Sequence, residues 1–252
     1  MKAFVKAYWK TLLFFAAVGL IGGWFTGLYA LESYPPQLQQ ELLAQGMTAA
    51  VLSLVSAVQS AGYGLVLGAA GIRLGKKTGL WKDERRITKK PLLAALLISL
   101  VGGLALILPD LLFFGKYEQA LLDIYTVKPT IPYLLATVTY GAVIEEIMLR
   151  LFMMSLAAYV LHLLFERRRE GVSTAVLAVA NAVSALLFAA GHLPATEMTF
   201  GLTPMLVFRC FLLNGVFGLA FGWLYRRFGL RYAMIAHGGC HVVSKLIWIL
   251  FI

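Results

Sequence analysis

The chain has 252 residues, of which 60% are hydrophobic and 13% are charged, and its mean hydropathy is +0.81. These values exclude a soluble enzyme, a disordered tail and a secreted disulfide scaffold. After Glu41 the next charged residue is Arg73, and the uncharged stretch between them exceeds the roughly 20 residues that one bilayer crossing needs. Cys210 and Cys240 lie inside apolar segments without the CxxC spacing of a metal or redox site, so we interpret both as packing residues. The sequence therefore predicts an integral membrane protein.

The first apolar segment follows Lys2, Lys6 and Lys10 and superficially resembles a signal peptide. It is long for the apolar part of a signal peptide, and the residues from Glu32 to Pro36 offer no small-residue cleavage site, so we interpret it as a span. Seven apolar segments follow one another along the chain: Thr11–Leu31, Leu42–Ile72, Pro91–Pro109, Pro129–Phe165, Ser173–His192, Met205–Tyr225 and Tyr232–Ile252. They leave no room for a soluble domain, and residues 1–252 are predicted to form one all-α, polytopic transmembrane helix bundle.

The basic residues gather in short connections between these segments. Lys and Arg are dense in Arg73–Lys90, Arg167–Arg169 and Arg226–Arg231, whereas Glu32–Glu41 and Leu193–Pro204 contain neither. Basic loops remain on the cytoplasmic side of a membrane, so the pattern predicts that the N-terminus and the basic loops are cytoplasmic. The net charge of +10 is thereby explained without nucleic acid, and a modest attraction to anionic lipid headgroups is expected.

The segment Pro129–Phe165 is too long for a simple crossing. The alternation of sides places Lys128 outside and Arg167 inside, so the segment must cross once. As a continuous helix it would run about 55 Å, compared with a hydrocarbon thickness of about 30 Å. It must therefore protrude, tilt strongly or break into two helices. We expect about eight helices and seven or eight crossings.

Ionisable side chains inside a bilayer are costly and are usually functional, so they form the group of candidates. The apolar segments contain Glu145, Glu146, Arg150, His162, His192, Arg209, His237, His241 and Lys245. His162, Arg209 and Lys245 are interpreted as side chains that reach an interface or form hydrogen bonds within the bundle. Arg209 is also kept as a candidate for binding a substrate carboxylate.

Two adjacent carboxylates, Glu145 and Glu146, cannot both stay ionised and unpaired in hydrocarbon. Glu146 and Arg150 are four residues apart on one helix face, which predicts an ion pair. Glu145 points roughly 100° away from Glu146 and has no partner on its own helix. Its position suits a general base for water. The alternative, in which all three residues form a buried network that fixes helix packing, remains open at this point.

Histidines supply the second part of the pattern. His192 ends one segment, whereas His237 and His241 share one face of the last helix at a spacing of four residues. Imidazole and carboxylate together are the ligand and acid–base set of metallohydrolases. Gly238 and Gly239 thin this helix, so that a neighbouring helix or a substrate backbone could approach closely.

The order of these motifs is more specific than any one of them. Glu145-Glu146-x-x-x-Arg150, then Phe188-x-x-x-His192, then His237-x-x-x-His241 occur in this order inside membrane spans. This order resembles the CPBP family, the CAAX-processing and bacteriocin-immunity-type intramembrane proteases. The resemblance covers residues 129–252, which would carry the catalytic core, and the first three spans are generically compatible with it.

The resemblance implies hydrolysis of a peptide bond inside the membrane. Glu145 would activate the attacking water with assistance from His192, and Glu146 and Arg150 would support the site. His237 would contact the water, a metal or the oxyanion that forms at the scissile carbonyl.

The sequence departs from the family pattern at His241, where relatives often have asparagine. The change adds a third imidazole, so that His192, His237 and His241 could hold a zinc ion if the site uses one. Family members have been discussed both as metalloproteases and as metal-free glutamic proteases, and the glutamic type is favoured here because the position tolerates a residue that is not a metal ligand.

The expected substrate is a hydrophobic, lipid-anchored, leader or C-terminal peptide that enters a cavity between helices. The expected location is a prokaryotic plasma membrane, with the lipid bilayer as the constant partner. Two other classes of protein are the alternatives. A non-enzymatic immunity or scaffold protein would keep the polar cluster for packing, and a transporter would use it as a proton relay, although no paired, similarly interrupted halves are visible in the sequence.

Overall fold

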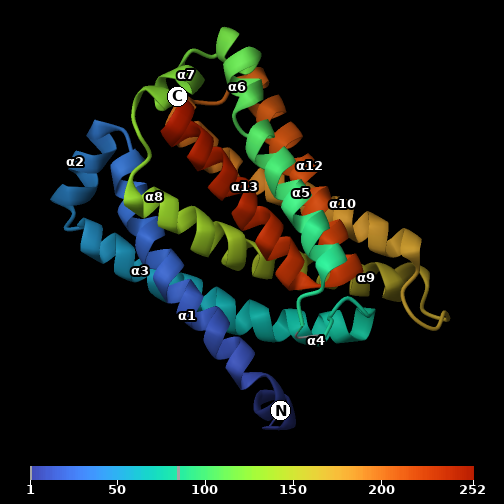
Figure 1. Cartoon of the computed structure of the whole chain (residues 1–252). Helices are drawn as coiled ribbons and strands as arrows, with labels where there is room; N and C mark the ends of the chain where they lie inside the picture. The colour runs from blue at the N-terminus through green and yellow to red at the C-terminus, as the bar shows by residue number, and fades with distance from the viewer. Residues whose placement is uncertain (1, 84–85) are drawn as a thin grey trace.

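The computed structural model describes residues 2–83 and 86–252, and within them the chain is helical without strands (Figure 1). The helices are α1 (Lys2–Ser33), α2 (Pro36–Ala44), α3 (Ala49–Gly62), α4 (Gly68–Thr78), α5 (Lys89–Ala105), α6 (Leu108–Leu112), α7 (Ala120–Asp123), α8 (Ile131–Ala136), α9 (Ser155–Phe165), α10 (Thr174–Gly191), α11 (Leu193–Phe200), α12 (Pro204–Phe228) and α13 (Leu230–Phe251). Three π-helical segments, Tyr63–Leu67, Thr137–Glu145 and Ile147–Met154, join some of them without a break.

Seven of the described helical stretches are long and apolar enough to cross a membrane. The predicted all-α polytopic bundle is therefore confirmed, and its seven stretches correspond to the seven apolar segments of the sequence. Two boundaries differ from the prediction. Pro36–Ala44 forms a separate short helix before the second span, and Leu193–Phe200, predicted as a loop, is helical because Pro194 occupies the first turn of α11, where its missing N–H has no intrahelical partner to lose. Arg85, one of the basic residues of the predicted inner loop, lies outside the described residues.

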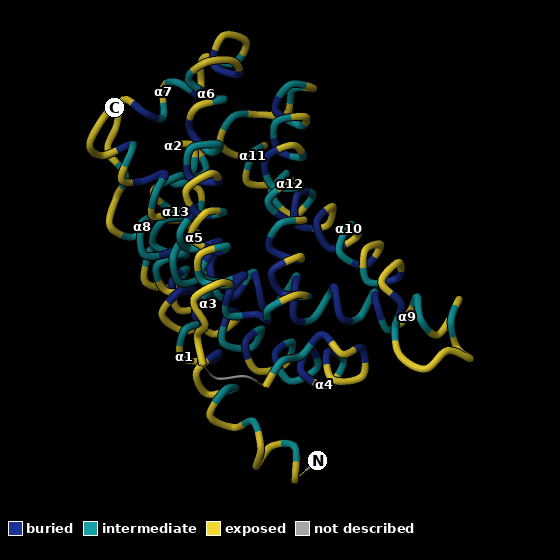
Figure 2. Tube along the Cα trace, turned by 45° about the vertical axis from the view of Figure 1, so that its right-hand side comes forward, coloured by how far each residue is buried: buried dark blue, intermediate teal, exposed yellow. Residues whose placement is uncertain are grey.

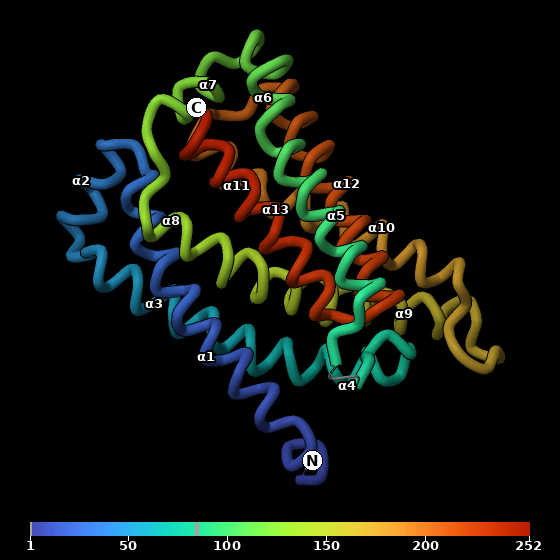
Figure 3. The backbone as a smooth tube through the Cα atoms, in the orientation of Figure 1, coloured from blue at the N-terminus to red at the C-terminus, as the bar shows by residue number. Residues whose placement is uncertain are grey.

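The long segment Ile131–Phe165 is a single helix that contains two π-helical stretches. It does not break into two helices, which was one of the three ways predicted for it to fit a bilayer. In Figure 1 it crosses the bundle at a shallower slope than α5 and α13, and the corner between α9 and α10 projects beyond the other helices in Figures 1 to 3. Tilt and protrusion therefore remain as the two predicted ways for its length to fit a bilayer.

Helices pack closely where small residues remove the side-chain barrier. A Cβ on Gly23 of α1 would overlap the backbone of Ser56 in α3, and a Cβ on Gly239 of α13 would overlap Ser99 of α5. On the preceding residue, a Cβ on Gly238 would lie 3.0 Å from Ala142 in the long helix. Gly238 and Gly239 therefore allow the long helix and α5 to approach α13 closely. The sequence predicted such an approach for one neighbouring helix.

The core lies between the long helix, α10, α12 and α13. Its buried side chains include Ile144, Ile147, Leu151, Phe221 and Ala236. Many large apolar side chains instead face outward, which Figure 2 shows as yellow stretches along the outer helices. This distribution is expected for a protein whose surrounding solvent is lipid.

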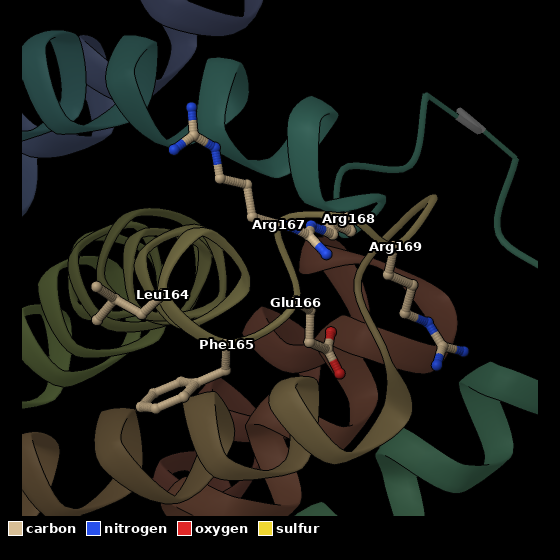
Figure 4. Close-up of a pocket in the computed structure, with 6 residues that line it drawn as sticks. All are labelled: Leu164, Phe165, Glu166, Arg167, Arg168 and Arg169. Atoms are coloured by element: carbon tan, nitrogen blue, oxygen red, sulfur yellow. The ribbon is translucent and has the colours of Figure 1, made fainter.

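A hollow of about 560 Å³ lies at the connection between α9 and α10, lined by Leu164, Phe165, Glu166 and Arg167 to Arg169 (Figure 4). The three guanidinium groups point in different directions in Figure 4, so they do not converge on one ligand. The Glu166 carboxylate accepts a hydrogen bond from the Ser173 N–H at 3.0 Å, and hydrogen bonding from Ser173 lowers the pKa of Glu166. This hollow belongs to the turn between two helices and contains none of the predicted site residues.

Candidate active site

Glu146 and Arg150 are completely buried, and Arg150 Nε lies 3.4 Å from Glu146 Oε2. The predicted pairing of these two residues is confirmed. Arg150 Nη2 also donates to the Gly218 carbonyl of α12 at 3.2 Å, and the guanidinium lies 4.3 Å from the ring centre of Phe188 in α10. One guanidinium therefore ties the long helix to α10 and α12 through charge, hydrogen bonding and cation–π contact.

His237 joins the two glutamates. Its Nδ1 lies 2.9 Å from Glu146 Oε1, and its Nε2 lies 3.9 Å from Glu145 Oε2. The ring is buried and stacks on Phe221 at a centroid distance of 4.8 Å. An ionised carboxylate can only accept, so His237 Nδ1–H donates a hydrogen bond to Glu146, and this contact orients Nε2 toward Glu145. Sequence reasoning had given Glu146 only Arg150 as a partner, because nothing in the spacing links residues 91 positions apart.

Glu145 differs from Glu146 in exposure. Its side chain is 22% exposed, whereas that of Glu146 is fully buried. Among the described residues no hydrogen bond to the Glu145 carboxylate is formed, and its nearest ionisable partner is His237 Nε2 at 3.9 Å. Such a gap is too long for a direct hydrogen bond but allows one water to contact both groups. Glu145 is thus the carboxylate that a water or a substrate can reach.

His241 lies beside His237, with ring centroids 5.0 Å apart. Both Nε2 atoms face Gly141, one helical turn before Glu145: a Cβ built there would lie 3.4 Å from His241 Nε2 and 4.0 Å from His237 Nε2. The absence of a side chain on Gly141 therefore leaves space in front of both imidazoles. On the other edge of the His241 ring, Lys245 Nζ lies 3.4 Å from Nδ1.

His192 stands directly after α10, and its Nδ1 lies 2.8 Å from the Phe188 carbonyl oxygen. The Phe188 ring contacts both His192, at a centroid distance of 4.7 Å, and His237, at 5.6 Å. Within the described residues His192 makes no hydrogen bond to either glutamate. His192 lies between α10 and α11, within the apolar helical stretch Thr174–Phe200 rather than at its end.

Arg209, the candidate for binding a substrate carboxylate, already has an acidic partner. Its Nε and Nη2 lie 2.5 and 2.6 Å from the two oxygens of Asp110, which is fully buried and also accepts a hydrogen bond from Tyr125 at 3.1 Å. This bidentate pair joins α12 to α6. Sequence reasoning missed Asp110 because it directly follows the apolar segment that ends at Pro109. A contact between Arg209 and a substrate stays a prediction.

The contacts of the three histidines decide whether they can hold a zinc ion. Within residues 2–83 and 86–252, no group of three or more His, Cys, Asp or Glu side chains is arranged to hold a metal ion. A metal-bound imidazole normally donates its other N–H to an acceptor. His192 and His237 have such acceptors in Phe188 and Glu146, but His241 faces an ammonium, which is not one. The set therefore does not fit zinc in this arrangement, and the zinc hypothesis stays a prediction.

The fold and the site define a polytopic membrane protein with a carboxylate–imidazole cluster inside the helix bundle. Residues 127–243 match the family described as Type II CAAX prenyl endopeptidase Rce1-like, and over this segment the chain is similar to that family. The matched segment contains all of Glu145, Glu146, Arg150, His192, His237 and His241. No curated protein and no solved structure matches the chain. The predicted resemblance is confirmed over this segment, and the matched family is described as one of CAAX prenyl endopeptidases.

Proposed function

We propose that the protein is a glutamic intramembrane endopeptidase in which Glu145 activates the attacking water. The observation that carries the proposal is the position of His237 between two unequal carboxylates, one buried and hydrogen-bonded, the other partly exposed and free. Glu146 and Arg150 hold His237 in place, and Glu145 remains available for proton transfer. Separate environments for two neighbouring carboxylates are a recurrent way of giving them separate roles.

In the proposed reaction, a water beside Glu145 gives its proton to the carboxylate as its oxygen bonds to the scissile carbonyl carbon. The negative charge that develops on the carbonyl oxygen is stabilised by an N–H donor of His241, whose Nε2 faces Gly141. The protonated Glu145 then transfers its proton to the leaving nitrogen as the C–N bond breaks. His192 assists through Nε2, which is free because Nδ1 faces the Phe188 carbonyl.

The proposed substrate is a hydrophobic, lipid-anchored, leader or C-terminal peptide. A site formed by partly exposed side chains within helices is reached from the membrane more readily by an apolar chain than by a soluble protein. We propose a prokaryotic plasma membrane as the location.

A second candidate is a non-enzymatic scaffold or immunity protein. The observation that favours it is the fully buried Glu146–Arg150 pair, whose contacts join three helices and would serve packing in any membrane bundle. The partial exposure of Glu145 is harder to explain in that way, since a carboxylate kept for packing would be expected to have a partner.

The change His241→Asn separates metal-free from zinc chemistry. In a metal-free site His241 only donates a hydrogen bond, and asparagine can donate one from a similar position, so the variant is expected to keep activity within about tenfold of the parent. Activity would be measured with a prenylated peptide alongside the zinc content of the purified proteins. Near-stoichiometric zinc in the parent, its loss in the variant, and recovery of chelated parent by added zinc would contradict the metal-free assignment.

The proposed orientation puts the N-terminus and the loop before α5 in the cytoplasm. Ile87 in that loop and Leu202 before α12 are both exposed, and each can be changed to cysteine in a chain without Cys210 and Cys240. A membrane-impermeant thiol reagent is expected to label Leu202→Cys from outside and Ile87→Cys only after the membrane is opened. Labelling of both positions from one side would contradict the proposed orientation.

A further inference from the structure

Lys245 is a buried cation without an acidic partner. It lies one turn after His241 on α13, and only 8% of its surface is exposed. In the part of the chain that the structure describes, no carboxylate pairs with it. Its ammonium lies 4.5 Å from the ring centre of Tyr133 and 3.4 Å from His241 Nδ1. Because a buried charge is costly unless it is paired or hydrogen-bonded, these two contacts call for an explanation.

The two contacts favour a charged lysine that acts as a donor. The face of the Tyr133 ring stabilises a cation, and an ammonium has only donors. The hydrogen bond between Lys245 and His241 therefore runs from Nζ to Nδ1, although at 3.4 Å it is long. A neutral imidazole that accepts at Nδ1 carries its proton on Nε2.

The proton on Nε2 lies on the side of the ring that faces the site. His241 Nε2 is the nitrogen closest to the position of a Cβ on Gly141, at 3.4 Å, and His237 Nε2 is 4.0 Å from the same point. An N–H there is directed toward Gly141, one helical turn before Glu145, where it could stabilise a developing negative charge. The same nitrogen has no lone pair left for a metal ion.

We propose that Lys245 is a positioning residue that fixes the Nε2–H tautomer of His241 and thereby makes this histidine a hydrogen-bond donor in the active site. The proposal rests on the proposed endopeptidase function. It also explains how a histidine can replace the asparagine that relatives often carry: an amide always has an N–H to donate, whereas an imidazole needs a neighbour that decides which nitrogen holds the proton.

The tautomer is measured by the ¹⁵N chemical shifts of the histidine rings in the full-length protein labelled at histidine, with His241→Asn used to assign the His241 signals. The parent is expected to show His241 with the proton on Nε2, and Lys245→Met is expected to shift it to a mixture of tautomers. Lys245→Arg, which keeps a charged donor, is expected to retain the parent signal. A parent His241 that carries its proton on Nδ1 would overturn the proposal, even if Lys245→Met does not fold.

The kcat and KM of the variants provide a second test of the proposal. Since loss of one donor to the oxyanion costs about 10² to 10³ in kcat, loss of its orientation in Lys245→Met is expected to lower kcat by about tenfold with KM unchanged. In the His241→Asn background, Lys245→Met is expected to change kcat less than twofold. An equal loss in both backgrounds, or an effect confined to KM, would overturn the proposal and favour a contact between Lys245 and the substrate. The tautomer needs no substrate, so its result stands apart from the test of Glu145.

Discussion

Glu145→Gln is expected to lower the rate of peptide hydrolysis by about two to four orders of magnitude, because the amide keeps the shape of the side chain but cannot take a proton from water. The melting temperature is expected to stay close to that of the parent, since Glu145 is 22% exposed and forms no hydrogen bond within the described part of the chain. The measurement is turnover of a prenylated CAAX peptide by purified protein in detergent or nanodiscs, together with a thermal unfolding curve.

The control for this change is Glu41→Gln, which removes an exposed carboxylate from α2, away from the predicted site. It is expected to leave both turnover and melting unchanged. Turnover by a folded Glu145→Gln variant at the parental rate would remove Glu145 from the mechanism.

Arg150→Ala is expected to lower stability by about 3 to 5 kcal/mol as well as activity, because it leaves the buried Glu146 without its cation. The loss also includes the hydrogen bond to the Gly218 carbonyl and the contact with the Phe188 ring. Chemical or thermal unfolding in a defined detergent measures the effect. A variant that expresses and melts like the parent would show that the pair contributes nothing to the folded state.

A variant that removes both charged groups of the pair tests how much of this loss comes from the unpaired charge of Glu146. The double variant Glu146→Gln/Arg150→Met has no uncompensated charge, so it is expected to be more stable than Arg150→Ala. It should nevertheless remain inactive, because the amide introduced by Glu146→Gln holds His237 less firmly than a carboxylate does. If the double variant were less stable than the single one, the hydrogen bond between Glu146 and His237 rather than the charge of Arg150 would dominate.

Composition and charge distribution were sufficient to predict the architecture. Apolar segments long enough to cross a bilayer, separated by basic turns, specify a helix bundle because backbone groups in hydrocarbon must form hydrogen bonds within their own segment. The spacing of Glu146 and Arg150 likewise predicted their ion pair, since both residues lie on one helix. Features that depend on neighbours along the chain were therefore accessible from the sequence.

Contacts between helices were not accessible in the same way. Glu146 meets His237, and Arg209 meets Asp110, across separations of 91 and 99 residues. Such pairs depend on how helices tilt and on which faces meet, and no periodicity in one sequence encodes that. The Lys245–His241 contact is an exception, because its four-residue spacing was visible, but a lysine on the last span was interpreted as a residue that reaches the interface.

The most direct test of a Glu145-dependent protease compares the membrane and secreted peptides of cells that contain the parent with those of cells that contain Glu145→Gln at equal abundance. This comparison by mass spectrometry presupposes no substrate. The account predicts one or a few peptides, hydrophobic or lipid-modified, that accumulate uncleaved in the variant and whose cleaved products appear only with the parent. Identical peptide sets in the two cells, with both proteins folded in the membrane and the candidate substrates expressed, would contradict it.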